Sequence, residues 1–124
     1  MYNKGRVMNL NQQQCEACKV GAPQLSKKEL ALFLDEYPSW SLIVEGGVNK
    51  ILREYTFKDF SVALSFTNAI GVISEQHDHH PDILTQWGKV TVTWWTHKIK
   101  GLHKNDIIMA SRSEALFSRF ELTL

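Results

Sequence analysis

The chain has 124 residues, and its 14 Lys and Arg against 13 Asp and Glu give a formal net charge of +1. This length suits one compact domain and is too short to hold two comfortably. The near-neutral charge, with no basic block or stripe, does not favour direct nucleic-acid binding. The polar start lacks the apolar segment of a signal peptide, and no run of about eighteen apolar residues occurs, so we expect a cytoplasmic protein without membrane association.

Residues 1–24 are rich in Asn, Gln and Lys and have little apolar periodicity. They predict a flexible N-terminal arm, followed by a single domain over residues 25–124. The arm holds the two cysteines of the chain, Cys15 and Cys18. In a cytosolic protein their C-x-x-C spacing is more typical of reduced thiols than of a structural disulfide. The pair is half of a tetrahedral thiolate metal site, and no second C-x-x-C completes it.

The domain is predicted to begin with a short helix that ends before Pro38. Ser26 and Glu29 have the spacing of a capping box, and apolar residues at helical spacing follow, at Leu30, Phe33 and Leu34. Two strands over residues 42–45 and 48–57 come next, joined by a two-residue turn at Gly46 and Gly47.

A long helix is predicted after the two strands, with Asp59 as its N-cap and its end near Gln76. Its apolar residues keep the i, i+3, i+4 spacing of one buried face, at Val62, Ala63, Phe66, Ala69, Ile70 and Ile73. Pro81 prevents the helix from continuing. Residues 83–87 and 89–96 then predict a second antiparallel pair that turns at Gly88.

The last strand alternates in a way that assigns its two faces. Val90, Val92 and Trp94 share one face, and a regular pleat leaves His97 on the more polar face at the strand's end. Asn105 or Asp106 can cap a final helix with apolar positions at Ile107, Ile108, Leu116 and Phe120. The order α-β-β-α-β-β-α predicts an α+β fold with a four-stranded antiparallel sheet backed by helices on one face.

All five histidines of the chain lie in one short stretch together with several carboxylates. The stretch contains Glu75, His77, Asp78, His79, His80, Trp87, His97, His103 and Asp106. Histidine can both donate and accept a proton near neutral pH, because its ordinary pKa is about 6.5. The cluster therefore predicts acid/base catalysis or a metal site. His79 and His80 at a helix exit could meet His97 from a strand end, whereas His77 and His103 are the expected bystanders.

A metal site is the main alternative for this cluster. His79, His80 and His97 with Glu75 meet the ligand count of a zinc site. Side chains of adjacent residues usually diverge, however, and the H-E-x-x-H spacing is absent, so the pattern favours a site without metal. Nucleophilic catalysis is disfavoured because neither cysteine has a histidine nearby in the sequence and no G-x-S-x-G motif occurs.

The spacing of these residues resembles the pterin-4a-carbinolamine dehydratases. The pattern of that family has an acidic residue, three spacers, His-His-Pro, an aromatic residue, a histidine and a downstream aspartate, which here are Glu75, His79, His80, Pro81, Trp87, His97 and Asp106. The resemblance extends over about residues 26–120. The runs W-G-K-V-T-V-T-W-W-T-H and I-K-G-L-H-K-N-D look like the bacterial branch that is partnered with phenylalanine hydroxylase.

The resemblance implies an activity. A 4a-hydroxytetrahydropterin would lose water and become the quinonoid dihydropterin, which recycles the pterin of an aromatic amino acid hydroxylase, here phenylalanine hydroxylase as functional partner. The pterin is the substrate, and neither a metal nor another cofactor is implied. The family also implies a homodimer or homotetramer.

The resemblance also implies roles for particular residues. His79 and His97 would be the acid/base pair, and His80 would bind and orient the pterin. Four supporting residues would orient the imidazoles or contact the substrate, namely Glu75, Asp78, Asp106 and Trp40. Of these, Asp106 has an alternative explanation as a helix cap or as a first-turn acid that complements the helix dipole.

Two other function classes remain. Some animal members of this family are also dimerisation partners of a homeodomain transcription factor, so a non-enzymatic coregulator module is the first. A coregulator does not need all three histidines in their motif positions. Their presence therefore favours an enzymatic function. A metal-dependent lyase that uses the histidine cluster is the second.

Overall fold

The computed structural model describes Leu10 and residues 23–121. Cys15 and Cys18, with most of the predicted arm, lie outside the described residues. Leu10 falls within the predicted arm, yet its side chain is only 1% exposed and belongs to the hydrophobic core. Leu10 is therefore packed against the domain.

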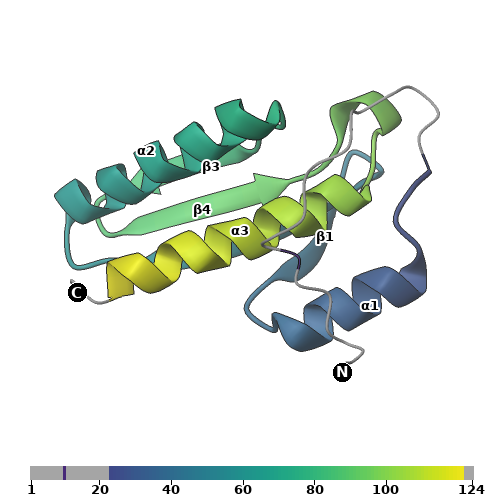
Figure 1. The fold of residues 1–124 in the computed structure, drawn as a ribbon, viewed down its shortest axis with the longest axis horizontal. Helices are drawn as coiled ribbons and strands as arrows, with labels where there is room; N and C mark the ends of the chain where they lie inside the picture. Colours follow the sequence, from purple (N-terminus) through teal and green to yellow (C-terminus); the bar gives the residue numbers. More distant parts are fainter. Residues whose placement is uncertain (1–9, 11–22, 122–124) are drawn as a thin grey trace.

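The described chain contains three α-helices and one four-stranded sheet, in the predicted order (Figure 1). The elements are α1 (Lys27–Glu36), β1 (Ser41–Glu45), β2 (Val48–Thr56), α2 (Phe60–His77), β3 (Asp82–Gln86), β4 (Lys89–Trp94), a 3-10 helix η2 (His97–Ile99) and α3 (Lys104–Glu121). The strands pair antiparallel in the order β1-β2-β4-β3, so the α+β prediction is confirmed. None of the helices in the described residues has the length and apolar character needed to cross a membrane.

Local signals begin the elements where the sequence predicts. Ser26 and Glu29 form the capping box of α1, with both reciprocal hydrogen bonds present. The Asp59 side chain accepts a hydrogen bond from Val62 N at the start of α2. Gly46 and Gly47 both have positive φ, 57° and 77°, and so form the tight β1–β2 turn that other residues would strain.

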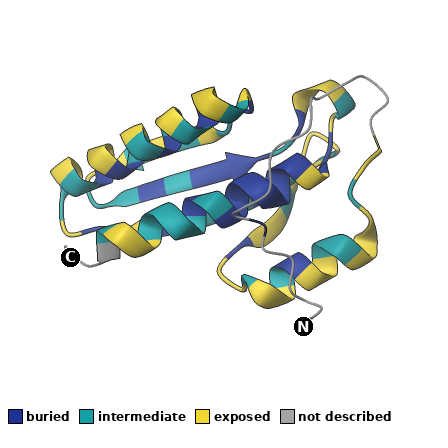
Figure 2. Ribbon diagram, viewed as in Figure 1, coloured by how far each residue is buried: buried dark blue, intermediate teal, exposed yellow. Residues whose placement is uncertain are grey.

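The core lies between the sheet and the pair of helices that cover one face of it. Figure 1 shows α2 and α3 running along β4, and Figure 2 shows that burial concentrates in β4 and the N-terminal half of α3. The predicted inward face of β4 is confirmed, because Val90, Val92 and Trp94 are fully buried. The cross-strand partners of Val90 and Trp94 on β2, which are Tyr55 and Ile51, are also fully buried.

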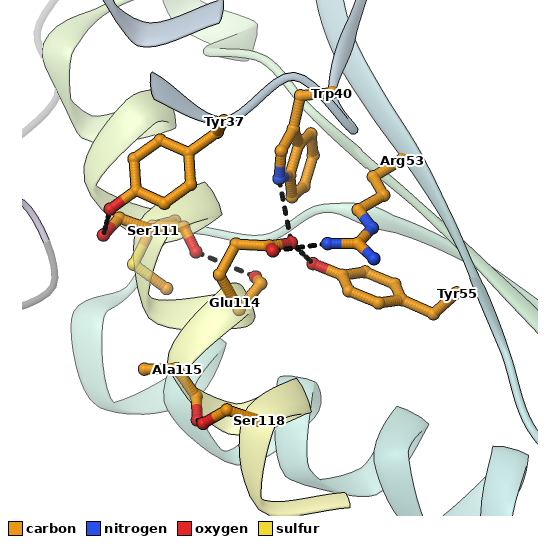
Figure 3. A network of polar contacts seen from close by, with 10 residues as sticks. Tyr37, Trp40, Arg53, Tyr55, Ser111, Glu114, Ala115 and Ser118 are labelled. Carbon is orange, nitrogen blue, oxygen red and sulfur yellow. Dashed lines mark hydrogen bonds and ion pairs between the residues drawn. The ribbon is translucent and has the colours of Figure 1, made fainter. Parts of the chain in front are cut away.

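A polar network ties α3 to β2 and to the segment after α1 (Figure 3). The Glu114 carboxylate accepts hydrogen bonds from Trp40 Nε1 at 3.0 Å and from Tyr55 Oη at 2.6 Å, and it forms an ion pair with Arg53. Burial and the adjacent carboxylate raise the pKa of Tyr55 far above its ordinary value. The phenol therefore stays protonated and serves as a hydrogen-bond donor.

His77, in the last turn of α2, makes stability depend on pH. Burial and the positive charge of Arg112 lower the pKa of His77 below its ordinary value. The unfolded chain therefore binds this proton more readily than the fold, and stability is lost as the pH falls through about 6.5, where the unfolded histidine titrates. We expect His77→Gln to weaken this loss, measured as urea unfolding midpoints of both proteins between pH 7.5 and pH 5.5. Equal pH dependence of the two midpoints would contradict the assignment.

Candidate functional site

The end of α2 places His79 at the edge of the core. Asp78 has a left-handed backbone with φ 51°, its N–H donates to Glu75 O, and His79 N donates to Ser74 O at 3.1 Å. These two bonds are those of a Schellman motif, which satisfies carbonyls at a helix C-terminus and turns the chain sharply. The turn directs His79 inward, where it is only 5% exposed.

The left-handed conformation of Asp78 is a testable part of this turn. Glycine and asparagine tolerate this conformation, whereas a β-branched side chain is strained in it. We expect Asp78→Val to lower the free energy of unfolding by about 1–2 kcal/mol, with Asp78→Gly and Asp78→Asn close to wild type. Urea unfolding measures the difference. A valine variant as stable as the glycine variant would contradict it.

The carboxylate of Asp106 is the centre of a buried polar cluster. Its side chain is 0% exposed and receives three hydrogen bonds. Oδ1 is 2.7 Å from His79 Nε2, and Oδ2 accepts from Thr96 Oγ1 at 2.8 Å and from His103 N at 2.9 Å. An ionised carboxylate can only accept hydrogen bonds, and a buried carboxylate needs donors to replace the water that it has lost. The three donors around Asp106 meet this need.

The start of α3 supplies this carboxylate. The helix begins at Lys104, so neither Asn105 nor Asp106 precedes it, and the predicted cap was wrong by two or three residues. Instead His103 Nδ1 accepts from Asn105 N at 3.0 Å, while Asp106 reaches back to His103 N. The arrangement is reciprocal, like a capping box. His103, an expected bystander, thus orients Asp106.

The His79 ring is held from two directions. It stacks on the indole of Trp94, with ring centroids 5.5 Å apart and planes 8° apart. Because Asp106 acts as the acceptor, we assign the proton of their shared hydrogen bond to His79 Nε2. In the neutral ring the lone pair is then on Nδ1.

His80 points to a different environment from its neighbour. Its Nε2 is 2.5 Å from Glu75 Oε2, and both side chains are exposed, at 54% and 79%. Glu75 lies in the last turn of α2, where a carboxylate is mildly unfavourable, so a partner such as the His80 ring suits it. In water such a pair contributes little to stability, so its value is in orienting the imidazole.

His97 lies in a turn and not on a strand. β4 ends at Trp94, and His97 begins η2, so the expectation of a regular pleat up to His97 was wrong. The pleat ends because Thr96 pairs with Gly101 and Lys100 takes a left-handed conformation, φ 49°. His97 is exposed.

The imidazole of His97 packs flat on the neighbouring indole. The rings of Trp95 and His97 are 4.2 Å apart and inclined by 19°, and Lys50 Nζ lies 4.0 Å from the centre of the Trp95 ring. Stacking and the cation over the indole fix the orientation of both side chains. Trp95 is therefore the support of the His97 ring.

The two remaining predicted residues lie apart from these contacts. Trp40 is 3% exposed and hydrogen-bonded to Glu114, and Trp87 is 69% exposed between β3 and β4. In the described part of the chain, no three His, Cys, Asp or Glu side chains are grouped to hold a metal ion. Sequence reasoning missed Thr96, Trp94 and the cap at His103. Of these, only Thr96 could have been suspected from the sequence, because it directly precedes His97.

Comparisons with known proteins agree on one family. The sequence profile described as "Pterin 4 alpha carbinolamine dehydratase" matches residues 23–116. The chain is 50% identical over 107 residues to a protein of Syntrophotalea carbinolica named "Putative pterin-4-alpha-carbinolamine dehydratase", covering 86% of this chain and 96% of that protein.

Two solved structures have the same fold. The transcriptional coactivator/pterin dehydratase of Brucella melitensis is 32% identical with a TM-score of 0.68, covering 76% of this chain and 98% of that one. A pterin dehydratase-like protein identified as a RuBisCO assembly factor in the alpha-carboxysome is 22% identical, with a TM-score of 0.54 and coverage of 63% and 88%. The second likeness concerns the fold alone.

Proposed function

Since the chain belongs to the pterin-4a-carbinolamine dehydratase family, we propose that it dehydrates a 4a-hydroxytetrahydropterin by histidine acid/base catalysis. In this reaction the C4a–O bond breaks and a C4a=N5 double bond forms. The leaving hydroxyl takes up one proton to become water, and N5 gives up one proton. The products are the quinonoid dihydropterin and water, so the reaction is that of a hydro-lyase.

The observation that carries the proposal is the buried pair of His79 and Asp106. An imidazole whose Nε2–H is held by a buried carboxylate has a fixed tautomer and a fixed ring orientation. Such a ring can take up and release a proton at Nδ1 without moving. Each positioned proton transfer contributes typically 10²- to 10⁴-fold to a rate.

His97 is the proposed second member of the acid/base pair. It is exposed, and its ring is held by the indole of Trp95 and so presented to a ligand in a defined orientation. One of His79 and His97 would donate to the hydroxyl while the other accepts from N5. The reaction then leaves the total number of protons on the enzyme unchanged.

His80 and four other residues have proposed supporting roles. His80, oriented by Glu75, would bind the pterin. Asp106 holds the His79 ring in this proposal, and Asp78 acts by turning the chain into His79. We propose that Trp40 is near the pterin edge; its contact with Glu114 fixes the indole.

The wider setting is proposed from the family. The product suits recycling of the pterin used by an aromatic amino acid hydroxylase, with phenylalanine hydroxylase as the functional partner. The protein would act in the cytoplasm as a homodimer or homotetramer. Size-exclusion chromatography with light scattering distinguishes these two states from a monomer.

The test of the function is dehydration of enzymatically generated 4a-hydroxytetrahydropterin, followed by ultraviolet absorbance. Wild-type protein is expected to accelerate the reaction over its spontaneous rate, and treatment with a chelator is expected to leave the rate unchanged. No acceleration would contradict the dehydratase. Loss of activity on chelation, restored by added metal, would favour the metal-dependent lyase instead.

A further inference from the structure

One carboxylate connects the two proposed catalytic histidines. Asp106 Oδ1 binds His79 Nε2 at 2.7 Å, and Oδ2 accepts at 2.8 Å from the hydroxyl of Thr96, the residue that directly precedes His97. The two histidines come from the exit of α2 and the turn after β4, 18 positions apart in the sequence. The Thr96 hydroxyl and His79 Nε2 thus meet at one carboxylate, which links the two segments through the Asp106 side chain.

Thr96 is buried, and its backbone is fixed by two hydrogen bonds. It is 1% exposed, and its backbone N–H donates to Gly101 O at 2.8 Å while Gly101 N donates to Thr96 O at 3.4 Å. These two bonds close the turn that carries His97, and Lys100 N donates to His97 O within it. Thr96 therefore anchors the base of the turn, and its side chain fixes that base to Asp106.

We propose that Thr96 is a positioning residue of the dehydration, whose hydroxyl holds the His97 turn in register with the His79–Asp106 pair. The inference rests on the proposed function. Its chemistry requires a hydroxyl, because Oδ2 is an acceptor and only a donor can satisfy it. Valine has nearly the shape of threonine but cannot donate, so it leaves the buried carboxylate with two donors in place of three.

Three variants separate the hydroxyl from the shape of the side chain. Thr96→Val is expected to lower kcat by about 10- to 100-fold with little change in KM, as for other groups that orient a reacting residue. Thr96→Ser keeps the donor and is expected to retain most of kcat. Thr93→Val is the matched control, since Thr93 is a buried threonine of β4 whose side chain is not part of the Asp106 cluster.

A spectroscopic measurement tests the link without using activity. The His79 Nε2–H proton, held by a buried carboxylate, is expected to give a slowly exchanging imidazole signal in proton–nitrogen NMR spectra. We expect this signal to shift or broaden in Thr96→Val and to be restored in Thr96→Ser. Thr93→Val is expected to leave it unchanged.

The outcomes distinguish the inference from the function on which it rests. A valine variant with wild-type kcat and an unchanged imidazole signal would overturn the role of Thr96. So would equal losses of kcat in the Thr96→Val, Thr96→Ser and Thr93→Val variants, because general destabilisation would explain them. If wild-type protein does not accelerate dehydration, the proposed function fails. The NMR comparison then still supports or overturns the link from Thr96 through Asp106 to His79.

Discussion

His79→Ala and His97→Ala are each expected to lower kcat by about 10²- to 10⁴-fold, the usual contribution of a positioned proton transfer. In the first variant the buried Asp106 carboxylate also loses one of its three donors. In the second, the exposed ring stacked on Trp95 is removed and no buried contact is lost. Stopped-flow absorbance of the dehydration measures kcat for both.

Two controls keep loss of chemistry apart from loss of structure. His79→Gln places an amide N–H within reach of Asp106 but offers no group that titrates near neutral pH, so its kcat is expected to be as low as that of His79→Ala. His77→Gln replaces a nearby histidine that has no proposed catalytic role and makes no contact with Asp106, and it should keep wild-type kcat. Circular dichroism and urea unfolding show whether each variant is folded. Wild-type kcat in both His79→Ala and His97→Ala would rule out the assigned acid/base pair.

His80 is expected to behave differently from these two. Its ring is exposed and paired with an exposed carboxylate, an arrangement that orients a binding group rather than a buried proton carrier. His80→Ala should therefore raise KM by more than it lowers kcat. A loss of kcat as large as that of His79→Ala, at unchanged KM, would move His80 into the acid/base pair.

The order of the elements and several of their ends were predictable because they depend on neighbours in the sequence. The capping box at Ser26, the cap at Asp59 and the glycine turn at Gly46 each act within four residues. Apolar periodicity then identified the buried face of β4. These signals suffice for the fold because each local preference agrees with the final arrangement.

The contacts among the proposed site residues could be predicted from the sequence only in part. The contact of Glu75 with His80 joins residues five positions apart, at the end of α2 and just beyond it, so it depends on near neighbours in the sequence. The role of Thr96 did not follow, because it depends on a hydrogen bond to Asp106 ten residues away that forms only once the chain turns after β4. The turn itself depends on the left-handed conformation of Lys100, which its side chain does not signal.

Glu114→Ala is expected to cause the largest loss of stability, about 2–4 kcal/mol in the free energy of unfolding. The change removes the acceptor shared by Trp40 and Tyr55 and leaves Arg53 without its ion-pair partner. Breaking a buried pair costs about 3–5 kcal/mol, and we reduce this because the Glu114 and Arg53 side chains are 21% and 15% exposed. Urea unfolding at pH 7 measures the change.

The matched variants assign this loss to the network. Glu114→Gln keeps an acceptor oxygen for the Trp40 and Tyr55 donors and should lose less stability than Glu114→Ala. Glu54→Ala, which removes an exposed carboxylate 3.5 Å from Lys89, should change stability by no more than about 0.5 kcal/mol. Glu114 lies two helical turns from Asp106, about 12 Å along α3, so the folded variant should keep the His79–Asp106 pair and most of kcat, and the loss of the Trp40 contact should appear in KM. A Glu114→Ala protein as stable as Glu54→Ala would mean that apolar packing alone holds α3 against β2.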